Sequence, residues 1–230
     1  MNVLMLSLMY PEDTKDQVAR DAKDKLQNQI NSYQRAFVEG IRANLQDGEG
    51  MAIVNALPVG AFPLRYRRAV IPSGWHDGHA VYELGCFNLP GIKQRGRARR
   101  AARQLAAWCS RDPSNRVVLL YTMYLPYLEA VARVRRRYSD LKACVIVTDL
   151  PNELGLASGR KGLLKRIEYA RGRRSMALCR SMDAFVLLTR PMADALGVHD
   201  KPFLVIEGLI QRGEEPAHPA EQADPSARPA

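Results

Sequence analysis

Short apolar runs alternate with amphipathic stretches along most of this chain. Residues 3–8 form an apolar run interrupted only by Ser7, which is typical of a strand covered on both faces of a parallel sheet. Later runs of the same kind predict further strands at residues 51–57, 79–84, 117–121, 144–147, 185–188 and 204–206. The pattern therefore indicates a sheet buried between other elements.

Between these runs, apolar residues recur at steps of three and four, as on one face of a helix. The clearest set is Leu26, Ile30, Tyr33, Phe37, Ile41 and Leu45. Further helices are predicted at residues 98–108, 126–134, 163–179 and 191–196. Pro126 suits a first helical turn, and Gly197 suits a helix C-terminus. Residues 11–25 are polar and predict a loop, and residues 58–78 give only weak signals.

Strands that alternate with helices predict the α/β class. With right-handed crossovers, the arrangement is an open parallel sheet with helices on both faces, that is, a Rossmann-like domain over residues 1–208. Residues 209–230 are rich in Glu, Pro and Ala, a composition that favours disorder. They are expected to be either a disordered tail or a truncated interdomain linker.

Composition fits one soluble domain with a sizeable core: 230 residues, of which 47% are hydrophobic and 25% charged. No apolar run approaches the roughly 20 residues of a membrane span, and the N-terminus lacks the positive region of a signal peptide. Four widely spaced cysteines without a C-x-x-C motif predict reduced, structural thiols and a cytoplasmic location. The pair His76 and His79 flanks a turn and predicts no metal site.

The net charge of +10 is concentrated in two segments. The charged residues within 93–108 are all basic, and residues 160–180 contain many basic residues and one acidic residue, Glu168. Basic helices with one apolar face suit an anionic lipid surface; the alternative is a solvated basic face on helices packed against the sheet. The residues expected at the membrane surface are Lys93, Arg97, Arg100, Arg103, Arg160, Lys161 and Lys165. Nucleic acid is not an expected partner, because aromatic residues do not interleave with the bases.

Two common nucleotide-binding signatures are missing from the sequence. No G-x-G-x-x-G follows the first strand, which argues against a dinucleotide-dependent dehydrogenase. There is no P-loop either, so the sequence lacks the glycine-rich loop that would bind the phosphates of ATP for phosphoryl transfer.

Most candidate ligand-binding residues lie at the ends of the predicted strands, because open α/β sheets bind ligands outside the carboxyl ends of their strands. Asn28 and Gln29 lie instead at the start of a predicted helix. Hydroxyl, amide and carboxylate groups dominate there, which suits sugar hydroxyls. The candidates for substrate binding are Tyr10, Asn28, Gln29, Tyr121, Tyr124, Thr148 and Thr189. The tyrosines can stack on a sugar ring. The alternatives are core-edge tyrosines, capping threonines and a solvated helix turn.

Asp149 is the candidate for catalysis. It follows the apolar run 144–147 and precedes Pro151, so a carboxylate at a strand end can accept a proton from an attacking sugar hydroxyl. The alternative is that Asp149 caps the next loop or pairs with an arginine.

Several segments, in this order and spacing, resemble family-4 glycosyltransferases of the GT-B fold, in particular bacterial enzymes of polysaccharide and glycolipid assembly. The segments are residues 3–11, 27–40, 146–151, 185–192, 201–202 and 205–208. Together they extend over nearly all of residues 1–208.

The resemblance implies two Rossmann-like domains that face each other across a cleft. The N-terminal domain recognises a glycan or lipid-linked acceptor, and the C-terminal domain holds a UDP- or GDP-sugar as co-substrate, with no metal or cofactor needed. Residues 1–208 resemble the acceptor-binding half of such a hexosyltransferase, so the donor domain is expected to be missing from these 230 residues. In retaining relatives no protein nucleophile stands at the position of Asp149, so its implied role includes orienting the acceptor.

The resemblance has consequences for activity and location. The chain alone is expected to be inactive, with a donor-domain polypeptide supplied in trans as a partner, and to lie at the inner face of the membrane. The alternative is a noncatalytic module that binds a glycan or a membrane surface. Many relatives place a Gly-Gly pair in the first loop, where backbone amides approach the donor phosphates. Residues 11–25 contain no glycine, and here the helix start at residues 27–28 can meet phosphates instead.

Overall fold

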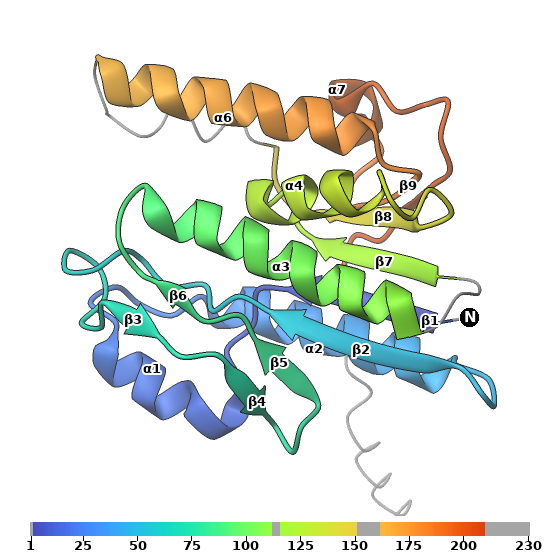
Figure 1. The fold of residues 1–230 in the computed structure, drawn as a ribbon. Helices are drawn as coiled ribbons and strands as arrows, with labels where there is room; N and C mark the ends of the chain where they lie inside the picture. Colours follow the sequence, from blue (N-terminus) through green and yellow to red (C-terminus); the bar gives the residue numbers. More distant parts are fainter. Residues whose placement is uncertain (1, 112–115, 151–161, 210–230) are drawn as a thin grey trace, which may run out of the picture.

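The computed structural model describes residues 2–111, 116–150 and 162–209. It is an α/β structure built on an eight-stranded sheet in the order β10-β9-β8-β7-β1-β2-β5-β4 (Figure 1). Every neighbouring pair in this sheet is parallel except β4 with β5. The strands are β1 (Asn2–Ser7), β2 (Gly50–Asn55), β4 (Gly74–His76), β5 (Val81–Glu83), β7 (Arg116–Tyr121), β8 (Lys142–Val147), β9 (Ala184–Leu187) and β10 (Phe203–Val205). The predicted fold class is confirmed.

The first strand lies in the middle of the sheet. Met5 of β1 pairs with Ile53 of β2 on one side and with Leu119 of β7 on the other. The chain first adds β2 and β5 to one side of β1 and then returns to add β7 to the other side. Strand order therefore reverses between β1 and β7, which is where ligands bind in sheets of this kind.

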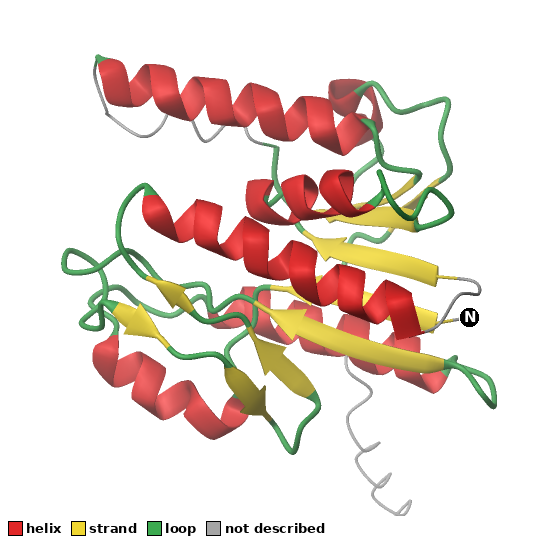
Figure 2. Cartoon of the chain, viewed as in Figure 1, coloured by secondary structure: helices red, strands yellow, loops and turns green. Residues whose placement is uncertain are grey.

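Helices cover both faces of the sheet, as the sequence pattern predicted (Figure 2). α2 packs on one face, in a cluster with Met5, Ile53 and Tyr121. α3, α4, α6 and α7 pack on the other face. The α-helices are α1 (Lys15–Asp21), α2 (Asn28–Ala43), α3 (Ile92–Arg111), α4 (Leu125–Val134), α6 (Leu163–Arg180) and α7 (Pro191–Leu196). None of the helices in the described ranges is long and apolar enough to cross a bilayer.

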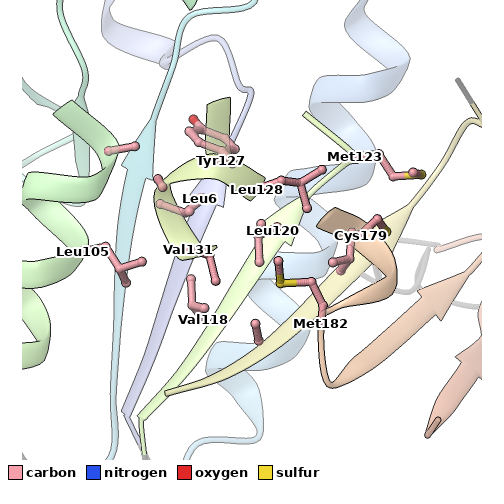
Figure 3. Packing of buried hydrophobic residues seen from close by; sticks show 14 of the residues in the cluster. Leu6, Leu105, Val118, Leu120, Met123, Tyr127, Leu128, Val131, Cys179 and Met182 are labelled. Carbon is pink, nitrogen blue, oxygen red and sulfur yellow. The ribbon is translucent and has the colours of Figure 1, made fainter. Parts of the chain in front are cut away.

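The larger core lies between the sheet and helices α3 and α4. Leu105, Tyr127 and Leu128 are fully buried there and contact apolar side chains of β1 and β7 (Figure 3). Close-packed side chains of this size contribute most of the hydrophobic stabilisation of a domain. The core therefore fixes α3 and α4 against the centre of the sheet.

Two local predictions were wrong or incomplete. Residues 11–25 were expected to be a loop, but they contain a 3-10 helix (Glu12–Thr14) and α1. Val18 of α1 is only 4% exposed and joins Tyr66 in a third apolar cluster, which holds this polar segment in place. The weakly patterned residues 58–78 contain β4 and β3 (Val70–Ile71), and β3 pairs antiparallel with β6 (Cys86–Phe87) in a separate ribbon.

Element ends agree closely with the sequence pattern elsewhere. Pro126 lies in the first turn of α4, and Gly197 ends α7 with a φ of 65°, a left-handed conformation that glycine adopts at low cost. α3 begins at Ile92, earlier than the predicted 98. Residues 210–230 lie outside the described part of the chain.

Candidate functional site

Hydroxyl and carboxylate groups gather at the carboxyl ends of β7 and β8, beside the reversal of strand order. The Thr148 Oγ1 lies 3.2 Å from Thr122 Oγ1 and 3.4 Å from Asp149 Oδ2. The ring of Tyr33, from α2, lies 6.3 Å from the ring of Tyr121. We call Tyr33, Tyr121, Thr122, Thr148 and Asp149 the hydroxyl cluster. Three of its members were predicted as site residues, and Tyr33 and Thr122 were not.

One end of the hydroxyl cluster is buried, and the other end is exposed to solvent. Tyr121 is 3% exposed, and burial raises its pKa to about 12, against the opposing effect of a hydrogen bond with Thr148. Burial also raises the pKa of Tyr33, whose buried hydroxyl has no hydrogen-bond partner among the described residues. Both phenols stay protonated near neutral pH and remain donors. Thr148 is half-buried and Asp149 is exposed, so the carboxylate lies where a ligand can reach it.

Tyr10, predicted to bind substrate, is held by the protein itself. Its side chain is buried, its hydroxyl donates to the Pro58 carbonyl at 3.2 Å, and the Gln27 amide donates to it at 3.5 Å. Its backbone N–H donates to Asn31 Oδ1 at 2.7 Å. These contacts tie the segment after β1 to α2, so Tyr10 stabilises the sheet edge and is not part of the hydroxyl cluster.

Tyr124 also bonds inside the protein. Its hydroxyl accepts a hydrogen bond from Arg97 Nη1 at 3.1 Å and donates one to Gln94 Oε1 at 2.6 Å. It therefore joins the start of α4 to α3, and its hydroxyl is already occupied on both sides.

The remaining predicted substrate ligands are surface groups. Asn28 and Gln29 are exposed at the start of α2, and Thr189 is exposed after β9. The Thr189 carbonyl accepts a hydrogen bond from the Met192 amide at 3.2 Å. Within the described residues, no hydrogen bond connects these three side chains to the hydroxyl cluster.

A row of buried polar side chains crosses the ends of β1, β2 and β5. Ser7, Asn55 and Glu83 are register partners on these strands. The Ser7 Oγ donates to Asn55 Oδ1 at 2.9 Å, and Asn55 Nδ2 donates to Glu83 Oε2 at 2.7 Å. The other Glu83 oxygen accepts from the Leu57 amide at 2.9 Å. This row fixes the loops at the binding edge, and the sequence pattern did not reveal it.

Lys93 and Arg97 belong to this buried network, so their prediction as membrane-surface residues was wrong. They are 7% and 2% exposed. Arg97 Nη2 donates to the Leu57 carbonyl at 2.7 Å, and Lys93 Nζ donates to the Val59 carbonyl. The physical reason is that the loop after β2 presents carbonyl oxygens to the start of α3, and buried carbonyls need donors.

Burial favours the uncharged forms of two ionisable groups in this network. It raises the pKa of Glu83 to about 7, although Arg97 and two hydrogen bonds act in the opposite direction. It lowers the pKa of Lys93 to about 7, and the nearby Arg97 charge adds to that effect. Desolvation of the charged forms therefore outweighs their attraction.

The other predicted membrane-surface residues differ in position. Arg103 and Lys165 are exposed and Arg100 is half-buried, whereas Arg160 and Lys161 lie outside the described residues. A hollow of about 440 Å³ lies between α3 and α4. We call it the arginine hollow, since its lining includes Arg99, Arg103, Arg133 and Arg137.

No group of His, Cys, Asp and Glu side chains in the described ranges is arranged to hold a metal ion. The cysteines at 86, 109, 144 and 179 are free thiols. Burial raises the pKa of Cys144 to about 11, which makes a reactive thiolate unfavourable there.

No model of a known protein family matches the chain, and no curated protein matches its sequence. The fold and the geometry of the sheet edge are therefore the observations that bear on function.

Proposed function

We propose that residues 1–208 are the acceptor-binding half of a glycosyltransferase, which transfers a sugar from a UDP- or GDP-sugar to a hydroxyl of a glycan or lipid-linked acceptor. The observation that carries this proposal is the hydroxyl cluster at the carboxyl ends of β7 and β8, with Asp149 exposed at its rim. Its location next to the reversal of strand order between β1 and β7 is where an open α/β sheet binds ligands.

The chemistry assigned to the cluster is positioning and deprotonation. The acceptor hydroxyl attacks the anomeric carbon, a new C–O bond forms, and the bond to the nucleoside diphosphate breaks. Asp149 receives the hydroxyl proton, and Thr148 and Thr122 orient the acceptor through hydrogen bonds. A nucleoside diphosphate leaves with the electron pair of the broken bond.

The donor site of this enzyme is assigned to polypeptide outside the 230 residues, in line with the resemblance to two-domain GT-B enzymes. The isolated chain therefore binds acceptor without transferring sugar. A polypeptide that supplies a donor domain restores transfer when it is added to the chain.

The test replaces Asp149 with Asn in the complemented enzyme. We expect transfer to fall by roughly 10²–10⁴-fold, since a general base is removed, while acceptor binding measured by calorimetry changes little. Asp200→Asn, at another exposed carboxylate, is the matched control and keeps full activity. An Asp149→Asn enzyme with unchanged transfer overturns the assignment of the base.

A second candidate function is a noncatalytic module that binds a glycan or a membrane surface. The arginine hollow favours the membrane form, because Arg99, Arg103 and Arg133 have no ion-pair partner in the described structure. This candidate predicts binding to anionic vesicles and no transfer under any complementation. In both candidates we place the protein at the inner face of the membrane.

A further inference from the structure

A second hollow lies near the β4 edge of the sheet, away from the hydroxyl cluster. It has a volume of about 260 Å³ and lies between β5 and α3. β7, β1 and β2 separate β5 from β8, which at about 4.8 Å per strand places the two sites well apart. We call it the edge hollow; its lining residues are Ser73, Tyr82, Leu84, Gly85, Arg100, Arg103 and Gln104.

An exposed tryptophan, Trp75, packs against Tyr82, which lines the edge hollow. Trp75 of the edge strand β4 pairs directly with Tyr82 of β5, so the two side chains project from the same face of the sheet. Their ring centroids are 5.1 Å apart at an angle of 67°, and the His79 ring lies 6.2 Å from Trp75 on a nearly parallel plane. Although these neighbours hold the indole, it is 55% exposed. A supported and exposed aromatic ring is a platform for stacking.

The charge in the edge hollow is positive and unpaired. Its lining contains two guanidinium groups and no carboxylate. Neither Arg100 nor Arg103 has a hydrogen-bond or ion-pair partner in the described structure. Arginine presents a planar set of donors that matches a carboxylate in a bidentate pair. The edge hollow therefore offers an anion its two strongest donors together with the amide of Gln104 and the hydroxyl of Ser73.

Gly85 keeps the edge hollow in this shape. A Cβ atom at this position would lie 2.4 Å from the Ser73 backbone nitrogen and 2.8 Å from Arg100 Nη1. Any side chain here would displace Arg100 or the backbone after β3. The close approach of Gly85 and Arg100 thus depends on glycine.

We propose that the edge hollow and Trp75 bind a uronic acid unit of an acidic glycan. The indole of Trp75 stacks on the apolar face of the pyranose ring, and Arg100 and Arg103 bind its carboxylate. Ser73 and Gln104 donate hydrogen bonds to the hydroxyls of the ring and accept hydrogen bonds from them. The volume is below the roughly 300–1,000 Å³ of sites for drug-sized ligands, which suits one sugar unit. The proposal does not depend on transfer chemistry, because the site is separate from Asp149.

The test uses the fluorescence of Trp75. The chain has two tryptophans, so Trp108→Phe leaves Trp75 as the sole indole. We expect a saturable change in emission when a tetrasaccharide of alternating glucuronic acid and N-acetylglucosamine is added, and at least tenfold weaker binding of neutral cellotetraose. Arg100→Gln in the same background is expected to weaken binding of the acidic tetrasaccharide at least tenfold. Arg95→Gln, at an exposed position on the same helix that lines neither hollow, is the matched control and is expected to leave binding unchanged.

Three results overturn the proposal. They are no saturable change with the acidic tetrasaccharide, equal binding of the neutral one, and equal binding of inorganic phosphate alone, which would show a general anion site. If Trp108→Phe fails to fold, the two indole N–H resonances of the unaltered chain report the same titration by NMR. The measurement needs no donor sugar and no transfer, so its failure and a failure of the proposed transferase function are distinguishable.

Discussion

Individual residues show how far the burial of a charged side chain can be predicted from the sequence. Arg97 stands four positions before Ala101 and eight before Leu105, all of them buried on α3. That spacing continues the apolar face of the helix and could have indicated that Arg97 points inward. Its electrostatic interaction with the buried Glu83 could not be identified in the same way, because the two residues come near each other only when β5 and α3 pack together.

The buried Glu83 carboxyl predicts a specific dependence of stability on pH. Burial raises its pKa from 4.5 to about 7, so the native state binds this proton more tightly than the unfolded state. The contribution of Glu83 to the free energy of unfolding is therefore complete below pH 4.5 and is lost as pH rises to 7. The loss is on the order of 3 kcal/mol. Lys93 acts in the opposite sense, since its pKa falls from 10.5 to about 7 and stability returns between pH 7 and 10.5.

Urea unfolding of Glu83→Gln at pH 5 and at pH 7 measures this contribution. The variant is expected to lose the part of the pH dependence that Glu83 supplies, so its free energy of unfolding falls less than that of the unaltered protein between the two pH values. Equal falls in both proteins would contradict the raised pKa.

Secondary-structure elements were predictable in proportion to their length and periodicity. The buried strands β1 and β7 and the helix α2 carry strong patterns and were confirmed. β3 and β6 have two residues each, which is too short for any alternation to appear. α1 has one buried residue, Val18, and is held by contacts with distant residues such as Tyr66. Tertiary contacts, which the local sequence does not contain, determine these elements.

Packing of α3 on the sheet predicts a large effect of one core substitution. Leu105 is fully buried among side chains of the sheet and α4. We expect Leu105→Ala to lower the free energy of unfolding by about 2–5 kcal/mol, because it removes apolar contacts and leaves a cavity. Leu64→Ala is the control for the same chemical change: Leu64 is 78% exposed, so its effect stays within about 0.5 kcal/mol. Chemical denaturation compares the two, and similar losses would contradict the packing.

At the scale of the whole molecule, topology explains which part of the candidate site was predictable. Tyr121 ends β7 and Thr148 follows β8, and these strands are parallel neighbours, so a sheet model alone brings the two residues together. Tyr33 comes from α2, and its contact with Tyr121 depends on how that helix crosses the sheet. The buried row Ser7, Asn55 and Glu83 depends on strand register. Neither helix crossing nor register is encoded in local periodicity.

The arginine hollow predicts where the molecule meets an anionic surface. We expect the double variant Arg99→Glu with Arg133→Glu to lose most of its binding to vesicles containing phosphatidylglycerol at low salt, because both side chains line the hollow. The double variant Arg20→Glu with Arg42→Glu is a matched charge reversal at exposed positions on α1 and α2 that do not line the hollow, and it is expected to retain binding. Vesicle cosedimentation at low and high salt measures this, since salt screens exposed charges. Equal losses in both variants would show that total charge alone matters.

The central place of β1 also determines the order in which the sheet can be completed during synthesis. β1 is synthesised before both of its neighbours, so Met5 must wait for Ile53 and then for Leu119 before both edges of the strand are paired. On the ribosome, this buried strand therefore emerges long before its second neighbour exists. The whole segment between β1 and β7 is translated while one edge of β1 stays unpaired, and an exposed strand edge is prone to association with other chains.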